Sequence, residues 1–190
     1  MINVDDLYIV NYCHPNCKPF MNICRLPEDE AFSLAYRMAA ENSDATAFGR
    51  FVDFGNYYPR RMRQDEYLYD MFASLGGKPR EKHPLSFVLQ GSEYLYEWFG
   101  KGIISKIRLR DIPSEYVSFT LGDSGSALVR DGGLTMYTKE TLLSVIREYD
   151  GTMDDFLGEI ERAHHYHYIE AQLWNDDYCA LAEIMEVDNI

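Results

Sequence analysis

The sequence lacks any long apolar run, any internal repeat and any low-complexity stretch. No segment reaches the roughly 18 consecutive apolar residues that a membrane-spanning helix needs, so we expect no membrane span. No linker rich in proline, glycine or serine divides the 190 residues, and we expect residues 1–190 to form a single globular domain. Hydrophobic residues make up 46% and charged residues 26% of the chain, which excludes a disordered tail or a fibre.

Basic residues are also scarce. The chain has 18 Lys and Arg residues but 31 Asp and Glu residues, for a net charge of −13. We therefore do not expect direct nucleic-acid binding. Residues 50–110 contain 11 basic and 7 acidic residues, whereas residues 139–190 contain 3 basic and 13 acidic ones. This pattern is typical of two solvated faces, and it leaves open a contact with a protein partner or between copies in a homo-oligomer.

The cysteines are few, and they are Cys13, Cys17, Cys24 and Cys179. Residues 1–12 contain two aspartates and lack the basic start of a signal peptide, so we expect a cytoplasmic protein with reduced thiols. The first three cysteines fall within twelve residues, next to a histidine, which leaves a structural zinc site open. Their spacing is not that of a CxxC pair, and we favour buried thiols over zinc.

The spacing of apolar residues predicts both helices and strands. Helices are predicted at residues 27–42, 64–75, 92–99, 138–149 and 152–165, the last opened by a capping box of Thr152 and Asp155. Strands are predicted at residues 7–12, 85–90, 103–110, 115–121, 167–174 and 182–187. These elements follow no regular βαβ order. The sequence therefore predicts an α+β fold, with a mixed or antiparallel sheet, several flanking helices and a helical N-terminal third.

Two clusters of polar side chains are candidate sites. Arg60, Arg61 and Arg63 follow a run of aromatics, and they suit an anion site or salt bridges to the acidic C-terminal region better than nucleic acid. Histidines at positions 164, 165 and 167 lie where a helix gives way to a strand, and they could supply a metal ligand or a catalytic base. Polar surface is the more common role of such a cluster.

The run Gly122-Asp123-Ser124-Gly125 resembles the segment around the nucleophile of chymotrypsin-like serine proteases. A protease of that kind would need a histidine base upstream, for which His83 is the best placed candidate. The strand pattern of the two six-stranded barrels is missing, and helices are too many. We therefore favour a polar turn that leaves a strand.

The predicted strand at residues 167–174 is the strongest candidate for a functional site. Glu170, Gln172 and Trp174 alternate with apolar residues and so share one face. A carboxylate and an amide at this spacing can grip a ribose together, and a glutamate beside an aromatic wall can be tuned as a base. An edge strand with a polar outer face is the alternative explanation.

Residues 83–190 resemble the catalytic part of ADP-ribosyltransferase-like domains. Glu170 corresponds to the catalytic glutamate on a late strand of that family, and Ser118-Phe119-Thr120 is similar to its Ser-Thr-Ser strand. Residues 85–91 and the helix that follows resemble the opening unit of the NAD-binding core. The family's arginine or histidine on that first strand has no clear counterpart, and its Glu or Gln before the catalytic glutamate falls at Tyr168.

The resemblance implies a toxin or modification enzyme that transfers ADP-ribose from NAD. Glu170 would then hold a ribose hydroxyl and stabilise an oxocarbenium-like ribose. The implied cofactor contacts are Ser118, Thr120, Gln90, Gln172 and Trp174, with Trp174 stacked on a ring. The alternative is a non-enzymatic domain for protein–protein interaction or regulation, which the uneven charge and the 14% aromatic content would suit.

Overall fold

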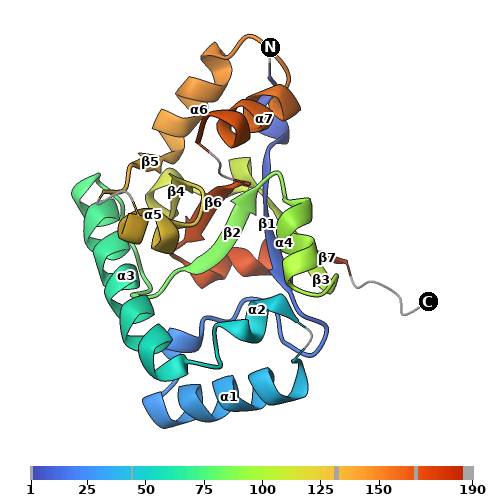
Figure 1. Cartoon of the computed structure of the whole chain (residues 1–190). Coiled ribbons are helices and arrows are strands. Elements are labelled where there is room, and N and C mark those ends of the chain that lie inside the picture. Colours follow the sequence, from blue (N-terminus) through green and yellow to red (C-terminus); the bar gives the residue numbers. More distant parts are fainter. Residues whose placement is uncertain (1, 44, 131–132, 165–166, 186–190) are drawn as a thin grey trace.

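In the computed structural model, which describes residues 2–43, 45–130, 133–164 and 167–185, the chain builds one seven-stranded sheet with helices around it (Figure 1). The strand order is β5-β4-β6-β2-β1-β3-β7, and every paired strand is antiparallel to its neighbours. The predicted α+β fold with an antiparallel sheet and flanking helices is therefore confirmed.

Six of the seven strands lie where the period-two pattern predicts them, with one or two residues trimmed from most ends. The pattern missed β5, which is only three residues long, and residues 186–187 of the last predicted strand lie outside the described residues. The strands are β1 (Tyr8–Cys13), β2 (Leu85–Leu89), β3 (Ile103–Arg108), β4 (Val117–Leu121), β5 (Met136–Thr138), β6 (Ile169–Leu173) and β7 (Glu183–Met185).

The helices are α1 (Glu28–Glu41), α2 (Thr46–Gly49), α3 (Phe54–Ser74), α4 (Glu93–Trp98), α5 (Ser124–Arg130), α6 (Lys139–Glu148) and α7 (Met153–His164). The prediction began α3 ten residues too late, because Pro59 reads as a helix breaker. In the structure Pro59 lies inside the helix, where its missing N–H removes only the bond to the carbonyl of Gly55. The capping box of α7 is confirmed, since the Thr152 N–H donates to Asp155 at 3.0 Å and the Asp155 N–H donates back at 3.1 Å.

One face of the sheet forms the main core together with α6 and α7. Strand residues such as Phe87 and Phe119 are about 1% exposed or less, and they belong to the same buried cluster as Leu142, Ile146 and Phe156 of the two helices. Figure 1 shows α6 and α7 together above the sheet. The alternation of apolar residues along β2, β4 and β6 directs these side chains to one side.

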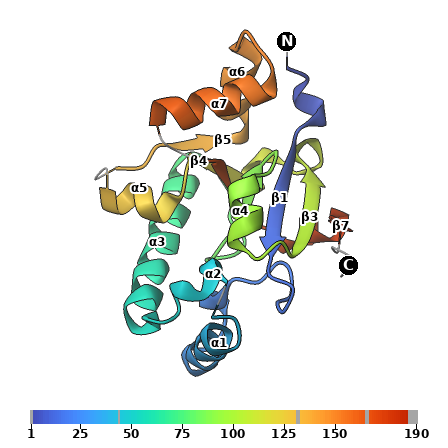
Figure 2. The same cartoon turned by 45° about the vertical axis from the view of Figure 1, so that its right-hand side comes forward.

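The opposite face of the sheet is covered by α3 and, across a cavity, by α1 and α2. Trp174 packs with Leu68 and Phe72 of α3, and the Phe72 ring stacks on the indole at 5.7 Å. A separate aromatic cluster joins α1, α2 and the start of α3 below the sheet (Figure 1). Figure 2 shows α4 beside β1. Within the described ranges, no helix combines the length and apolarity needed to cross a bilayer.

Candidate functional site

A cavity of about 960 Å³ lies between the sheet and the N-terminal helices. Its walls come from β1, β2 and β6 on one side, and from α1, α2, α4 and the start of α3 on the others. Its volume is at the upper end of the range of small-molecule sites, roughly 300–1,000 Å³. Glu170 of β6 is one of the residues that border it.

Glu170 is held in place by two neighbouring segments. Its Oε2 accepts a hydrogen bond from the backbone N–H of Ser124, the first residue of α5, at 2.8 Å. Its Oε1 accepts from the Ser86 hydroxyl on the adjacent β2, at 3.4 Å. Only 6% of the residue is exposed, so the carboxyl group borders the cavity without projecting into open solvent.

Burial and the nearby Asp123 carboxylate raise the pKa of Glu170 above its ordinary value of 4.5, while Arg61 and the Ser124 N–H oppose the rise. Burial dominates because it removes water from the charged form. A buried carboxyl group with a raised pKa can exchange a proton or, when ionised, support a developing positive charge. The site therefore holds the residue type and the electrostatics that acid–base or glycosyl chemistry uses.

Arg61 is linked to the Glu170 carboxyl group through the Ser86 hydroxyl. Its Nη2 donates to the Ser86 hydroxyl at 3.4 Å, and its Nε lies 2.8 Å from Asp65 one turn along α3. Although burial opposes its charge, the Asp65 carboxylate raises the pKa of Arg61, so the guanidinium is a permanent cation at the cavity wall. Of the two roles expected for the arginine cluster, an anion site or salt bridges to the C-terminal region, Arg61 fits the first, because its ion-pair partner Asp65 lies on its own helix and its side chain borders the cavity.

The other polar residues of the predicted site form a closed network instead of a cavity wall. Ser118 donates to the Gln172 side-chain oxygen at 2.8 Å, and the Gln172 amide donates to Thr120 at 3.0 Å. Trp174 donates its indole N–H to the Ser118 hydroxyl at 2.8 Å. All four residues have no exposed surface, and none of them borders the cavity. Their arrangement accounts for their polarity through internal hydrogen bonds.

Gln90 lies at the end of β2, as predicted, but its side chain supports the sheet. Its Oε1 accepts the backbone N–H of Tyr8 at 2.9 Å, and its backbone takes a φ of 61°, which is uncommon for residues other than glycine. Gln90 does not border the cavity. Of the six residues that the resemblance assigns to the active site, Glu170 alone borders the cavity.

Sequence analysis missed several residues that border the cavity beside Glu170. Arg50 lies 5.4 Å from the ring centroid of Phe51 and 5.5 Å from that of Tyr57, in cation–π geometry. Tyr168 also borders the cavity, and burial raises its pKa, with Asp123 and Glu170 adding to the effect. The available signal was the pair Arg50-Phe51, which repeats the neighbourhood of arginine and aromatic residues already noted at residues 57–63.

Two further predicted motifs take other roles. Ser124 opens α5 where the prediction had a polar turn, and its hydroxyl accepts a hydrogen bond from Gln64 at 2.8 Å. His83 instead places its Nδ1 3.0 Å from Asp65, so the hydrogen-bond partners do not join His83 and Ser124 as a protease pair.

The three N-terminal cysteines separate into two places. The thiols of Cys13 and Cys17 interact with each other beside the cavity. Cys24 instead lies with Asp65 and His83, within 4.8 Å of potential ligand atoms on both. Among the described residues, the three cysteines therefore do not form one ligand group.

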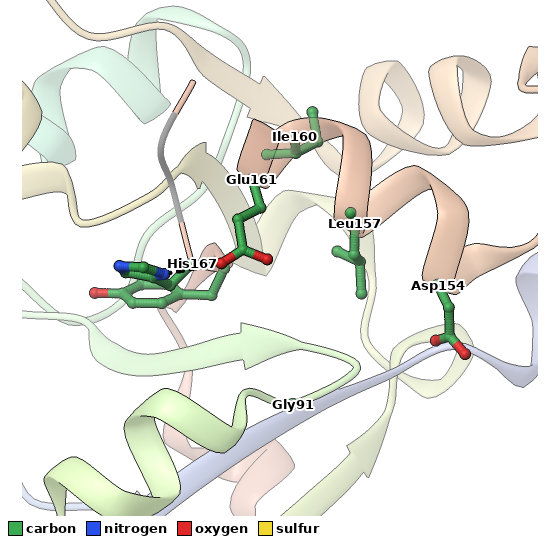
Figure 3. Close-up of a pocket in the computed structure, with 8 residues that line it drawn as sticks. Gly91, Asp154, Leu157, Ile160, Glu161 and His167 are labelled. Carbon is green, nitrogen blue, oxygen red and sulfur yellow. Dashed lines mark hydrogen bonds and ion pairs between the residues drawn. The ribbon is translucent and has the colours of Figure 1, made fainter. Parts of the chain in front are cut away.

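A smaller pocket of about 240 Å³, shown in Figure 3, adjoins the cavity. His167 and Tyr168 border both. Leu157 and Ile160 of α7 form its apolar side. His167 places its Nδ1 3.1 Å from Glu161 and stacks on the Tyr94 ring at 4.7 Å. The other two histidines of the predicted cluster, at 164 and 165, have no described side chain, so this cluster rests on His167 alone.

Comparison with protein-family models, with curated proteins and with solved structures found no match for this chain. The geometry of the cavity and the motifs of the sequence are therefore the evidence for a function. Function follows from a site and not from a fold class.

Proposed function

We propose that the protein is an NAD-dependent ADP-ribosyltransferase, a toxin or a modification enzyme, with its active site in the cavity beside Glu170. One observation carries the proposal. A buried carboxyl group with a raised pKa borders a cavity of nucleotide size, at the strand position that the family resemblance assigns to the catalytic glutamate. Buried carboxyl groups with perturbed pKa values are concentrated at functional sites.

The charge around the cavity supports an anionic ligand such as the pyrophosphate of NAD. The chain as a whole has a net charge of −13, yet the cavity wall holds four cationic side chains and three carboxylates. Local excess of one sign attracts ligands of the other. The cationic residues are Lys18, Arg37, Arg50 and Arg61, and the carboxylates are Glu30, Asp123 and Glu170.

Aromatic residues in the wall suit the ring systems of NAD. Tyr57, Tyr94 and Trp98 all border the cavity, and they come from α3 and α4 on its two sides. Aromatic side chains stack on nucleobases with about 1–3 kcal/mol per base. Trp98 and Tyr94 therefore replace Trp174 as the candidates for ring stacking, because the Trp174 indole is fully buried against α3.

The reaction assigns a simple role to Glu170. The bond between nicotinamide and the ribose breaks, and its electron pair leaves with neutral nicotinamide. A nucleophile of the acceptor forms the new bond to the anomeric carbon and gives up its proton. The ionised Glu170 stabilises the positive charge that builds up on the ribose between these events. Its fixed position against Ser124 and Ser86 means that little reorganisation is needed when the charge forms.

The test is the release of nicotinamide from NAD by purified protein, followed by chromatography. We expect slow release by the wild type even without an acceptor, because water can act as the nucleophile. Glu170→Gln should lower the rate by about 10²–10³-fold, as expected for the loss of one preorganised electrostatic group. Glu183→Gln is the matched control, since Glu183 is exposed on β7, outside the cavity wall.

The two outcomes separate the enzyme from a binding domain. Equal release by the wild type and Glu170→Gln, with both folded, would contradict the assignment of Glu170. No release and no NAD binding by the wild type would remove the transferase proposal. The cavity would then be a site for another anionic ligand or for a protein partner, the non-enzymatic alternative.

A further inference from the structure

A second group of chemically reactive side chains lies behind the cavity wall. Cys24 comes from a short 3₁₀ turn (Ile23–Arg25), Asp65 from α3, and His83 from the segment before β2. The Cys24 Sγ, one carboxylate oxygen of Asp65 and one ring nitrogen of His83 all lie within 4.8 Å of one another. The fold thus brings three different metal-ligand types together from three separate segments.

These side chains are removed from solvent. Cys24 is 4% exposed, Asp65 has no exposed surface, and the His83 side chain is 15% exposed. Asp65 is also held on both of its oxygens. Its Oδ1 forms an ion pair with the Arg61 Nε at 2.8 Å, and its Oδ2 lies 3.0 Å from the His83 Nδ1.

A catalytic thiol is one use for a cysteine, a histidine and an aspartate in contact. The surroundings of Cys24 argue against it, because Cys24 does not border the cavity where a substrate could reach it. Burial, and then the Asp65 charge, raise the pKa of Cys24 to about 12, so the free thiol is not activated as a nucleophile. A bound divalent cation reverses both effects, because it stabilises the thiolate directly.

We propose that Cys24, Asp65 and His83 bind one zinc ion. Sulfur, imidazole nitrogen and carboxylate oxygen are the three donor types of zinc sites, and the mixed set excludes the hard cations Mg²⁺ and Ca²⁺, which take oxygen ligands. Water completes the tetrahedron. Arg61 pairs with Asp65 from outside the ligand set, as second-shell residues of metal sites do.

The surrounding hydrogen bonds already hold the three segments in position. Arg25 donates its Nε to the carbonyl of His83 at 2.7 Å, and Asn22 donates to the carbonyl of Pro84 at 2.8 Å. Zinc would add a direct link from the N-terminal segment to α3 and to the start of β2. Since Asn22, Ile23 and Arg61 border the cavity, the ion would also fix part of its wall.

The test measures zinc in protein purified without a histidine tag, by mass spectrometry of the metal. We expect about one zinc per chain in the wild type and background levels in Cys24→Ser and His83→Gln. Cys179→Ser is the matched control, because Cys179 is a half-buried thiol that joins no such group within the part of the chain that the structure describes. The double variant Cys13→Ser/Cys17→Ser should keep its zinc.

A second measurement guards against variants that fail to fold. Chelator-treated wild type is titrated with Co²⁺, and we expect a thiolate-to-cobalt charge-transfer band that reaches a plateau at about one equivalent. Chelation should also lower the melting temperature by about 5 °C or more. Wild type without zinc and without the cobalt band would overturn the proposal. Loss of zinc from the Cys13/Cys17 variant, with retention in Cys24→Ser, would also overturn it.

Discussion

Glu170 and Gln172 lie two residues apart on the same face of β6, yet their surroundings are opposite. Glu170 borders a large cavity, together with the charged residues Arg61 and Asp123. Gln172 instead is hydrogen-bonded to Ser118 and Thr120 and has no exposed surface. The strand pattern is the same at both positions. The difference comes from what lies against them, because α3 packs on Trp174 beyond one end of the strand, whereas the cavity lies at the other end. Polar residues on one face of a strand can thus have different roles: one borders a cavity, and its neighbour two positions along is part of a buried hydrogen-bond network.

The largest expected effect is a loss of stability on substitution of Trp174, next to the buried network of Ser118 and Gln172. Trp174→Ala removes a side chain with no exposed surface, and we expect a loss of about 3–5 kcal/mol in the free energy of unfolding. Guanidinium unfolding measures this loss. Trp174→Phe, which removes the hydrogen bond to Ser118 but keeps most of the ring, should lose only about 1–3 kcal/mol. Loss of NAD binding by a folded and stable Trp174→Phe would contradict a purely structural role for Trp174.

Ser118→Ala should cost about 1–3 kcal/mol of unfolding free energy, because it leaves the buried Trp174 N–H without an acceptor. We expect the rate of nicotinamide release to stay within about twofold of wild type, since Ser118 does not border the cavity. Urea unfolding and the release assay check the two parts. A large loss of release without a loss of stability would return Ser118 to its predicted role as a cofactor contact.

In the cavity wall, Arg50→Gln should weaken NAD binding by about tenfold, which corresponds to about 1.4 kcal/mol. Arg50 is exposed at the cavity wall, so stability should change by less than about 0.5 kcal/mol. Calorimetric titration measures the affinity. Arg147→Gln serves as the control, because Arg147 is exposed on α6, outside the cavity wall. Equal weakening in both variants would indicate a general charge effect.

The smallest effect is a change in stability with pH. Since the pKa of Glu170 is raised in the folded state, its ionisation disfavours folding as pH rises through that value. Glu170→Gln should therefore be at least as stable as wild type at pH 7, with an advantage that shrinks as pH falls toward 4.5. Unfolding curves at both ends of this range test it. A variant that is clearly less stable at pH 7 would show that the ionised carboxylate stabilises the fold.

Part of this site follows from the sequence. The alternation along residues 167–174 places Glu170, Gln172 and Trp174 on one face, which the structure confirms. It cannot tell which of them is covered, because the cover comes from α3, more than 100 residues away in the chain. The start of α3 also escaped prediction, and with it the position of Arg61 beside Ser86 and Glu170.

The same limit applies to the cysteines. Spacing grouped Cys24 with Cys13 and Cys17, because only neighbours along the chain are visible in a sequence. The fold instead places Cys24 against Asp65 and His83, from segments that come together only when α3 packs against the sheet. Local signals such as the capping box at Thr152 are predicted well, since all of their atoms lie within one turn.

The decisive experiment is a calorimetric titration of NAD into wild type and Ser118→Ala. We expect binding with one site per chain in both proteins, with the same affinity within about threefold, because Glu170 borders the cavity whereas Ser118 does not. Absence of binding heat in folded wild type at about 1 mM NAD would contradict the account. Loss of binding by a folded Ser118→Ala would contradict it equally.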